Sequence, residues 1–436
     1  MKLKEWYKNK YQLGSYLMVF QVVFIMIAFF VETALGMPHA VIYVTDLITL
    51  VLFLLSLEDL VKKKEKYCRS VVIFIGLFAL YTLIDFLLNS QSVLYYLWGL
   101  RNVFRFYIFF VSCMYLTKFE LIPKTTKVFV IFLYVNVLVC SWQFYLLKLP
   151  ADNICGLFGV VTKGSGYMNV LLVLVTVMAT VHYLNQRVAM WSFMIQISCC
   201  VYISIISELK AYYIELALIV FLTLTLVAIS KKKVSKRMVK AGILCVASMA
   251  FIAIATVKLN PEYWEGFFTP MGIWEEATRD SGYSASGDLN RLTAIPYLFE
   301  HIFHGSGKAL FGYGLGNCDY SSGYAFLNSP FYMQYEYLHY MWMLSAFLFL
   351  EVGLIGIVLY IGFFCFVAGV AYQNTKRYKL SEEEKFWNQV SAVVALCCVF
   401  FMMYNNCLRT EAAYLIYFVL ALPFVIALRN GEGDKV

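Results

Sequence analysis

The sequence predicts an all-α polytopic membrane protein with about twelve transmembrane helices and one large extracytoplasmic loop. Of its 436 residues, 61% are hydrophobic and the mean hydropathy is +0.72, whereas soluble domains have roughly 45–50% apolar residues. Apolar runs of about 20 residues, the length that crosses a bilayer core, recur along almost the whole chain. A transmembrane β-barrel would alternate apolar and polar residues over segments of about 10 residues, so we expect helices.

Twelve apolar segments are expected to cross the membrane, with boundaries accurate to a few residues. The tenth segment is too long for one ideal span, so we expect it to begin as an interfacial helix. The spans divide the chain into an N-terminal bundle (1–257), a large loop (258–338) and a C-terminal bundle (339–436). They cover roughly residues 15–35, 39–57, 69–88, 99–117, 127–147, 168–184, 189–207, 211–229, 240–257, 343–371, 387–404 and 411–428.

The distribution of basic residues predicts the orientation. Most of the 35 lysines and arginines, among them Lys62, Lys232 and Arg377, lie in the connections on one side of the predicted membrane. Because lysine and arginine are retained on the cytoplasmic side, we expect both termini in the cytoplasm and the large loop outside. This topology explains the net charge of +8, which is therefore no argument for a nucleic-acid partner.

Three cations are expected near the outer surface of the membrane. Arg101 and Arg105 are four residues apart, so they share one face of the fourth span, in its outer third. They either snorkel to the interface or pair with Asp85, or they bind a lipid-linked diphosphate at the outer leaflet. Lys210 lies in a tight hairpin between the seventh and eighth spans, where it is either a solvated cap or a further diphosphate ligand.

The large loop is rich in aromatic residues. Trp264 and Trp274 lie in its first half, and Tyr313 stands between two glycines in its second half. Aromatic faces stack on sugar C–H surfaces and glycines permit close backbone approach, which favours a glycan site. The same residues are also typical of a loop that is anchored at the membrane interface, and the sequence does not separate the two interpretations.

Cysteines and acidic residues show no metal-binding spacing. Most of the 12 cysteines lie inside predicted spans, where they behave as small apolar residues. Cys155, Cys318 and Cys407 are expected outside the spans, as free thiols rather than as a disulfide pair. We therefore predict no metal and no other cofactor.

The order of motifs in the loop resembles a known family. Arg291 is followed by Phe311-Gly-Tyr-Gly-Leu-Gly316, then by His339, and then by Glu351-Val-Gly-Leu-Ile-Gly356 at the start of a span. This order resembles the O-antigen polymerase and O-antigen ligase superfamily of bacterial envelope glycosyltransferases. The resemblance extends over about residues 150–372 and includes Gly156-Leu-Phe-Gly159 and the hairpin at Lys210. The N-terminal third resembles the family only in hydropathy.

The resemblance implies a metal-independent, inverting glycosyltransferase of the C-type architecture in the bacterial cytoplasmic (inner) membrane. Such enzymes transfer glycan from undecaprenyl diphosphate at the outer face of that membrane. The family's loop arginine matches Arg291 and its histidine matches His339. Lys210 stands where the family usually has arginine, which keeps the charge but loses the bidentate fork. Glu351 matches the acidic residue of the last motif, with either a structural role at the base of the loop or a catalytic one.

The chemistry of glycosyl transfer agrees with these assignments. Departure of a lipid diphosphate requires fixed cations, and Arg291 and Lys210 provide them. Activation of an acceptor hydroxyl requires a base with a pKa near neutrality, and His339 is the best-placed histidine, although without the resemblance a structural role is the simpler interpretation.

We therefore expect a polymerase of undecaprenyl-diphosphate-linked repeat units of O-antigen, capsule or exopolysaccharide. One alternative is an O-antigen ligase with the same donor and another acceptor. A second alternative is a transporter of lipid-linked oligosaccharide, whose charged residues would be spread over two related halves. The expected partners are the lipid-linked oligosaccharide and membrane lipid, with a chain-length regulator and a flippase of the same pathway as further candidates.

Overall fold

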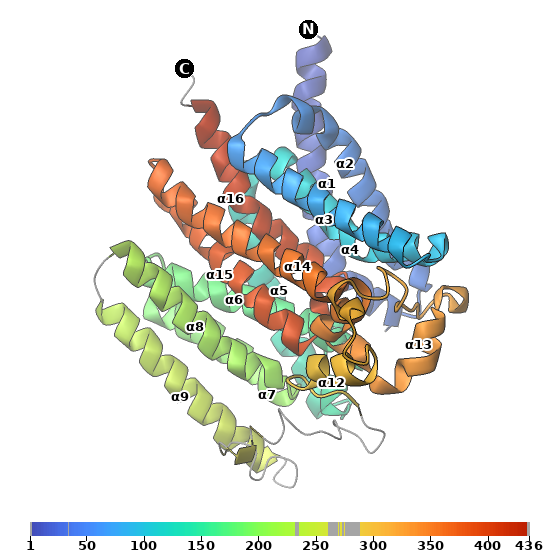
Figure 1. Cartoon of the computed structure of the whole chain (residues 1–436). Coiled ribbons are helices and arrows are strands. Elements are labelled where there is room, and N and C mark those ends of the chain that lie inside the picture. Colours follow the sequence, from blue (N-terminus) through green and yellow to red (C-terminus); the bar gives the residue numbers. More distant parts are fainter. Residues whose placement is uncertain are drawn as a thin grey trace.

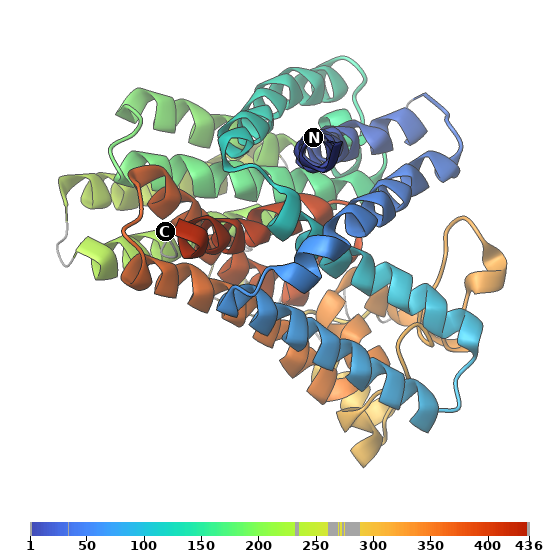
Figure 2. The same ribbon diagram turned by 90° about the horizontal axis from the view of Figure 1, so that it is seen from above.

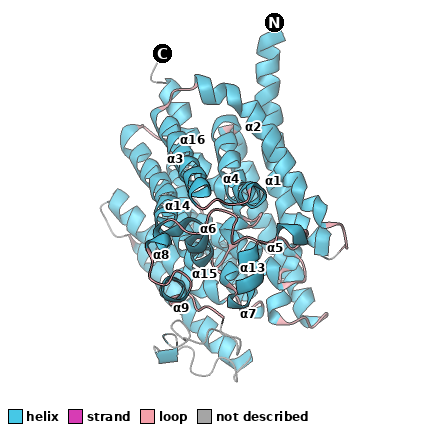
Figure 3. Cartoon of the chain, turned by 45° about the vertical axis from the view of Figure 1, so that its right-hand side comes forward, coloured by secondary structure: helices cyan, strands magenta, loops and turns pink. Residues whose placement is uncertain are grey.

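A computed structural model describes residues 2–33, 35–231, 235–259 and 288–433, together with residues 269, 271, 272 and 274. Every regular element in these residues is a helix, as Figure 3 shows. Nine helices precede the loop: α1 (Lys2–Thr33), α2 (Val44–Lys62), α3 (Lys66–Leu88), α4 (Val93–Leu116), α5 (Ile122–Tyr145), α6 (Ser165–Leu184), α7 (Met190–Ile206), α8 (Lys210–Lys231) and α9 (Lys236–Leu259). In the described part of the loop and after it come α12 (Ala294–His301), α13 (Pro330–Tyr335), α14 (Leu344–Arg377), α15 (Glu382–Tyr404) and α16 (Ala413–Gly433).

The helices confirm a polytopic membrane protein, but they do not establish twelve spans. Each predicted span overlaps one of the helices α1–α9 and α14–α16. Within the described residues, 10 helices are long and apolar enough to cross a membrane. The other two are α7, which has 17 residues, and α4, which contains Arg101 and Arg105. Twelve crossings therefore stay a prediction.

The bundle has two different ends (Figure 1). Helix α1 begins and α16 ends at one of them, while α12 and α13 of the large loop lie at the opposite one. We call the latter the loop end. This arrangement agrees with both termini on one side of a membrane and the loop on the other. The side that faces the cytoplasm is still a prediction from the basic residues.

Helices α6 and α16 form the centre of the bundle. Almost all of the side chains in their apolar windows are buried, whereas only 22% of those in α3 and in α9, at the periphery, are buried. From above, the red α16 lies within the bundle and the yellow-green α9 at its edge (Figure 2). The exposed apolar side chains of the peripheral helices fit a hydrocarbon surrounding, since water would not favour them.

The two glycine motifs that suggested the family resemblance interlock at the loop end. The Gly314 N–H donates to the Glu351 carbonyl oxygen at 2.8 Å, and the Gly316 N–H donates to the Glu351 carboxylate at 2.9 Å. A Cβ atom at Gly312 would lie 2.5 Å from the Glu351 carbonyl oxygen, so a side chain does not fit there. Helix α14 is interrupted at Gly353, which has φ 60° and ψ −168°, a conformation that is essentially restricted to glycine.

Helix α4 holds the second half of the loop. A Cβ atom at Gly99 would lie 2.5 Å from the backbone nitrogen of Gly316, so the two backbones touch. The indole N–H of Trp98 donates to the Tyr320 carbonyl oxygen at 3.2 Å. The described second half of the loop is therefore fixed both to α14 and to α4 at the loop end of the bundle.

Candidate functional site

His339 is held by a buried carboxylate. Its Nδ1 lies 2.5 Å from Asp288 Oδ1, and its ring stacks on Trp342 at 4.2 Å. The Asp288 side chain is 3% exposed, whereas that of His339 is 36% exposed. His339 Nε2 has no hydrogen-bond partner among the described residues. A carboxylate on one ring nitrogen orients the imidazole and leaves the other nitrogen available to take a proton.

Arg291 lies on a chain segment that is hydrogen-bonded to the segment of His339. The Leu289 N–H donates to the Leu338 carbonyl oxygen at 3.1 Å. The guanidinium of Arg291 lies over the Tyr404 ring, 4.1 Å from its centroid, and Nε donates to the Tyr404 carbonyl oxygen at 3.1 Å. The structure therefore brings together the two residues that the resemblance indicates, at the end of α15.

Lys210 lies at the same end of the bundle. It begins α8 two residues after Glu208, whose φ of 47° makes the hairpin tight. Helix α8 packs along α15, so Lys210 at the start of α8 and Tyr404 at the end of α15 both point to the loop end. The diphosphate-binding role of Lys210 stays a prediction.

A second group of cations surrounds a polar pocket at the loop end, which we call the arginine pocket. It contains ≈ 610 Å³ of space that protein atoms do not fill, part of it open to solvent. Its basic residues are Arg101, Arg105, Lys163 and Arg409. The other residues of its lining are His39, Tyr43, Trp98, Asn102, Asp319, Tyr320, Ser321, Ser322, Phe347, Asn406, Thr410 and Glu411.

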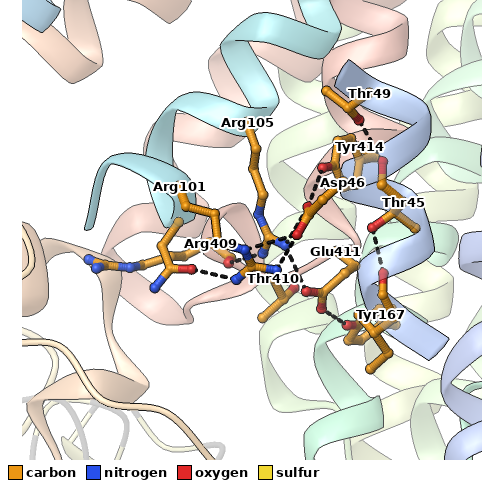
Figure 4. Close-up of polar contacts among 12 residues, drawn as sticks. Thr45, Asp46, Thr49, Arg101, Arg105, Tyr167, Arg409, Thr410, Glu411 and Tyr414 are labelled. Carbon is orange, nitrogen blue, oxygen red and sulfur yellow. Dashed lines mark hydrogen bonds and ion pairs between the residues drawn. The ribbon is translucent and has the colours of Figure 1, made fainter. Parts of the chain in front are cut away.

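Arg101 and Arg105 pair with two acidic residues that are far away in the sequence (Figure 4). Arg101 donates from Nε and Nη2 to Asp46 at 2.9 and 2.5 Å. Arg105 Nη1 donates to Glu411 at 3.0 Å and to Asp46 at 3.3 Å. The predicted pairing with Asp85 is wrong, because α2 packs against α4 and places Asp46 beside both arginines. The Asp85 carboxylate instead accepts a hydrogen bond from a neighbouring asparagine.

Glu411 is the most strongly perturbed acid of the pocket. Its side chain is 14% exposed and also accepts a hydrogen bond from the Tyr167 hydroxyl at 2.5 Å. Burial raises the pKa of this carboxyl, but the Arg105 guanidinium and the Tyr167 hydroxyl outweigh burial and lower the pKa to about 2. Glu411 is therefore ionised at neutral pH and holds Arg105 in place.

Arg409 is a central residue that the sequence analysis missed. It lies in the short turn Cys407–Arg409 between α15 and α16, and its side chain is 5% exposed. Nη1 donates to Glu351 at 2.6 Å, and Nη2 donates to Asp319 at 2.5 Å. The Asn102 amide donates to the same Asp319 oxygen at 2.7 Å. The available signal was Glu351 itself, since a carboxylate at membrane depth requires a cation.

The contacts of Glu351 fit a structural role at the base of the loop. Its carboxylate joins the glycine motif at Gly316 to Arg409, and its side chain is completely buried. A group in this position orders the loop but does not itself face the pocket.

The predicted glycan residues lie in different surroundings. Trp264 lies outside the described residues, and Trp274 has an exposed side chain. The Tyr313 hydroxyl donates to the Ile302 carbonyl oxygen at 3.0 Å and its ring stacks on Phe303 at 5.0 Å, so this tyrosine packs the loop together. Roles of these residues in glycan binding stay predictions.

The three cysteines that were expected outside the spans are free but buried. Burial raises the pKa of the Cys318 thiol well above its ordinary value, so this thiol is unreactive at neutral pH. Within the described ranges, no group of three or more histidine, cysteine, aspartate or glutamate side chains is arranged to hold a metal ion.

An apolar groove lies beside the hairpin that contains Lys210. It is formed by α5, α7 and α9, and it contains ≈ 890 Å³ of space that protein atoms do not fill. Small side chains such as Ser198, Ala247 and Ala255 leave the groove open, and Phe144 and Phe251 line it as well. Its lining along α7 ends at Ile206, shortly before Lys210.

No protein-family model matches this chain, and no characterised protein sequence matches it either. The resemblance to the O-antigen polymerase and ligase superfamily therefore depends on the motifs themselves.

Proposed function

We propose that this protein polymerises undecaprenyl-diphosphate-linked oligosaccharide repeat units at the outer face of the cytoplasmic membrane. One observation supports the proposal most: His339, oriented by the buried Asp288, lies on a segment hydrogen-bonded to that of Arg291 at the loop end of the bundle. A base and a fixed cation in neighbouring segments are the groups that transfer from a glycosyl diphosphate requires.

In the proposed reaction, a sugar hydroxyl of the acceptor attacks the anomeric carbon of the donor. The bond between that carbon and the diphosphate oxygen breaks, and the electron pair leaves with undecaprenyl diphosphate. His339 Nε2 takes the proton of the hydroxyl, and the Asp288 carboxylate stabilises the resulting imidazolium. Arg291 stabilises the negative charge of the leaving diphosphate. Attack from the face opposite the diphosphate inverts the anomeric configuration.

Lys210 and the apolar groove complete this arrangement. Lys210 supplies a second cation at the loop end. The groove between α5, α7 and α9 ends near Lys210. Because α5 and α9 are apolar and long enough to cross a membrane, we expect lipid around the groove. A polyprenyl chain in the groove would place its diphosphate near Lys210, because apolar surface favours the chain and the cation favours the diphosphate.

The test is the distribution of glycan chain lengths in cells that produce Arg291→Ala or His339→Ala in place of the wild-type protein. For a polymerase, glycan collapses to single repeat units. For a ligase, long chains still form but accumulate on the carrier. For a transporter, single units stay on the cytoplasmic face, out of reach of an external glycosidase.

The matched control is His301→Ala, because His301 is an exposed histidine of α12 that stacks on Tyr297. This variant is expected to give wild-type chain lengths. Normal chain lengths in both Arg291→Ala and His339→Ala, at wild-type protein levels, would contradict the proposal. Arg291→Lys further separates charge from geometry, since lysine keeps the charge but loses the bidentate fork.

A further inference from the structure

The arginine pocket has guanidinium groups that are already neutralised. Arg101 has Asp46 as its partner, Arg105 has Glu411 and Asp46, and Arg409 has Glu351 and Asp319. These pairs connect α2, α4, α14, the large loop and the turn before α16. The remaining cation, Lys163, has an exposed side chain at the rim of the pocket.

This pairing disfavours an anionic ligand. A diphosphate that approaches Arg101 and Arg105 meets the carboxylates of Asp46 and Glu411 at the same guanidinium groups. It would either displace them, which leaves partly buried carboxylates without their cations, or be repelled by them. The charges of the arginine pocket therefore favour a neutral ligand, whereas the region of Arg291 and Lys210 is the proposed site of the diphosphate.

The same pairing makes the wall of the pocket rigid. The Arg101 guanidinium carbon lies 4.7 and 4.8 Å from the ring centroids of Tyr43 and Trp98, and its Nη1 donates to the Asn102 side chain at 2.8 Å. Asn102 in turn donates to Asp319. Donors and acceptors that are held in this way are oriented before a ligand arrives, which reduces the entropy that binding loses.

We propose that the arginine pocket binds a neutral sugar residue of the glycan. A sugar hydroxyl both donates and accepts hydrogen bonds, so it can use the carboxylate, guanidinium, amide and serine groups of this wall together. A phosphate group only accepts, and it brings the wrong charge. This inference rests on the proposed function in that the sugar belongs to a lipid-linked glycan.

The position of the pocket agrees with this assignment. Arg409 of the pocket lies in the short connection after α15, five residues after Tyr404, the last residue of α15, which holds Arg291. Residues in an extended chain are at most about 3.5 Å apart, so the two backbone positions are within about 17 Å of each other. A glycan whose diphosphate lies near Arg291 can therefore reach the arginine pocket within a few sugar residues.

The experiment uses the full chain in phospholipid nanodiscs, because detergents with sugar headgroups would themselves occupy a saccharide site. A panel of neutral methyl glycosides is tested by saturation-transfer NMR, and inorganic pyrophosphate is tested by phosphorus NMR. The blocking variant is Ser322→Trp, since Ser322 is an exposed residue of the pocket lining. Its control is Ser306→Trp, an exposed serine of the same loop that is not part of the lining.

We expect saturation transfer to at least one glycoside in the wild-type protein and in Ser306→Trp, and its loss in Ser322→Trp. Pyrophosphate binding should be unchanged by Ser322→Trp. In Asp46→Asn, which leaves Arg101 without a carboxylate, we expect new pyrophosphate binding that Ser322→Trp removes.

Two results would overturn the inference. The first is that no glycoside gives a signal that is lost in Ser322→Trp. The second is that the wild-type protein binds pyrophosphate and Ser322→Trp abolishes that binding. Both leave the proposed function intact if repeat units are still polymerised. Conversely, glycoside binding without polymerisation would contradict the proposed function and leave the sugar site in place.

Discussion

Replacing Glu411 with glutamine removes one charge from the arginine pocket and little else. The glutamine amide oxygen can still accept the hydrogen bond from the Tyr167 hydroxyl, and Arg105 keeps its contact with Asp46. One pKa unit corresponds to about 1.4 kcal/mol. The lowering of the Glu411 pKa from 4.5 to about 2 thus corresponds to a stabilisation of about 3 kcal/mol at neutral pH, which the variant is expected to lose.

The expected loss depends on pH. Because the pKa of Glu411 is lower in the folded state than in the unfolded state, its contribution is complete above about pH 4.5 and disappears as the pH falls through about 2. At pH 3 about half of the contribution is left. The difference in unfolding free energy between wild-type protein and Glu411→Gln should therefore shrink between pH 7 and pH 3.

The assay is unfolding by sodium dodecyl sulfate in mixed micelles at both pH values, followed by tryptophan fluorescence. Glu300→Gln is the control, because Glu300 is an exposed carboxylate of α12, and its replacement should change the unfolding free energy little at either pH. Equal stability of Glu411→Gln and the wild-type protein at pH 7, or a difference that does not change with pH, would refute the reasoning.

Two further predictions concern the membrane. In protein with serine at the exposed Cys365, Ser306→Cys should react with a membrane-impermeant maleimide in intact cells, whereas Lys379→Cys, between α14 and α15, should react only after lysis; the opposite pattern would reverse the orientation. Ala247→Trp, which fills the apolar groove, should reduce the binding of undecaprenyl phosphate measured by native mass spectrometry, while Val246→Trp, whose side chain is exposed beside the groove, should not. Equal binding by both variants would exclude the groove as the site of the lipid chain.

The helices could be predicted from the sequence because hydropathy is a local property. Each apolar run became a helix. The glycines of the loop were expected to allow close backbone approach, and Gly312 does lie against the backbone of Glu351, whereas the interruption of α14 at Gly353 was not predicted. The number of crossings does not follow from hydropathy alone, because helix α4 uses one face for arginines that pair inside the bundle.

Pairing across the bundle could not be predicted in the same way. Arg105 and Glu411 are 306 positions apart in the chain, and Arg409 and Asp319 are 90 apart. No local pattern encodes such contacts, because they depend on which helices pack together. For the same reason, the sequence placed Cys318 outside the spans but did not reveal that the folded loop buries it.

The most direct test of the account is polymerisation by the purified protein in liposomes that contain undecaprenyl-diphosphate-linked repeat units. The resemblance implies chemistry without a metal, and in the proposed reaction Arg291 and His339 supply the cation and the base. We therefore predict that long lipid-linked chains form in the presence of excess EDTA and that Arg291→Ala and His339→Ala leave only single units. Single units with the wild-type protein, or chains that form only when magnesium or manganese is restored, would contradict the account.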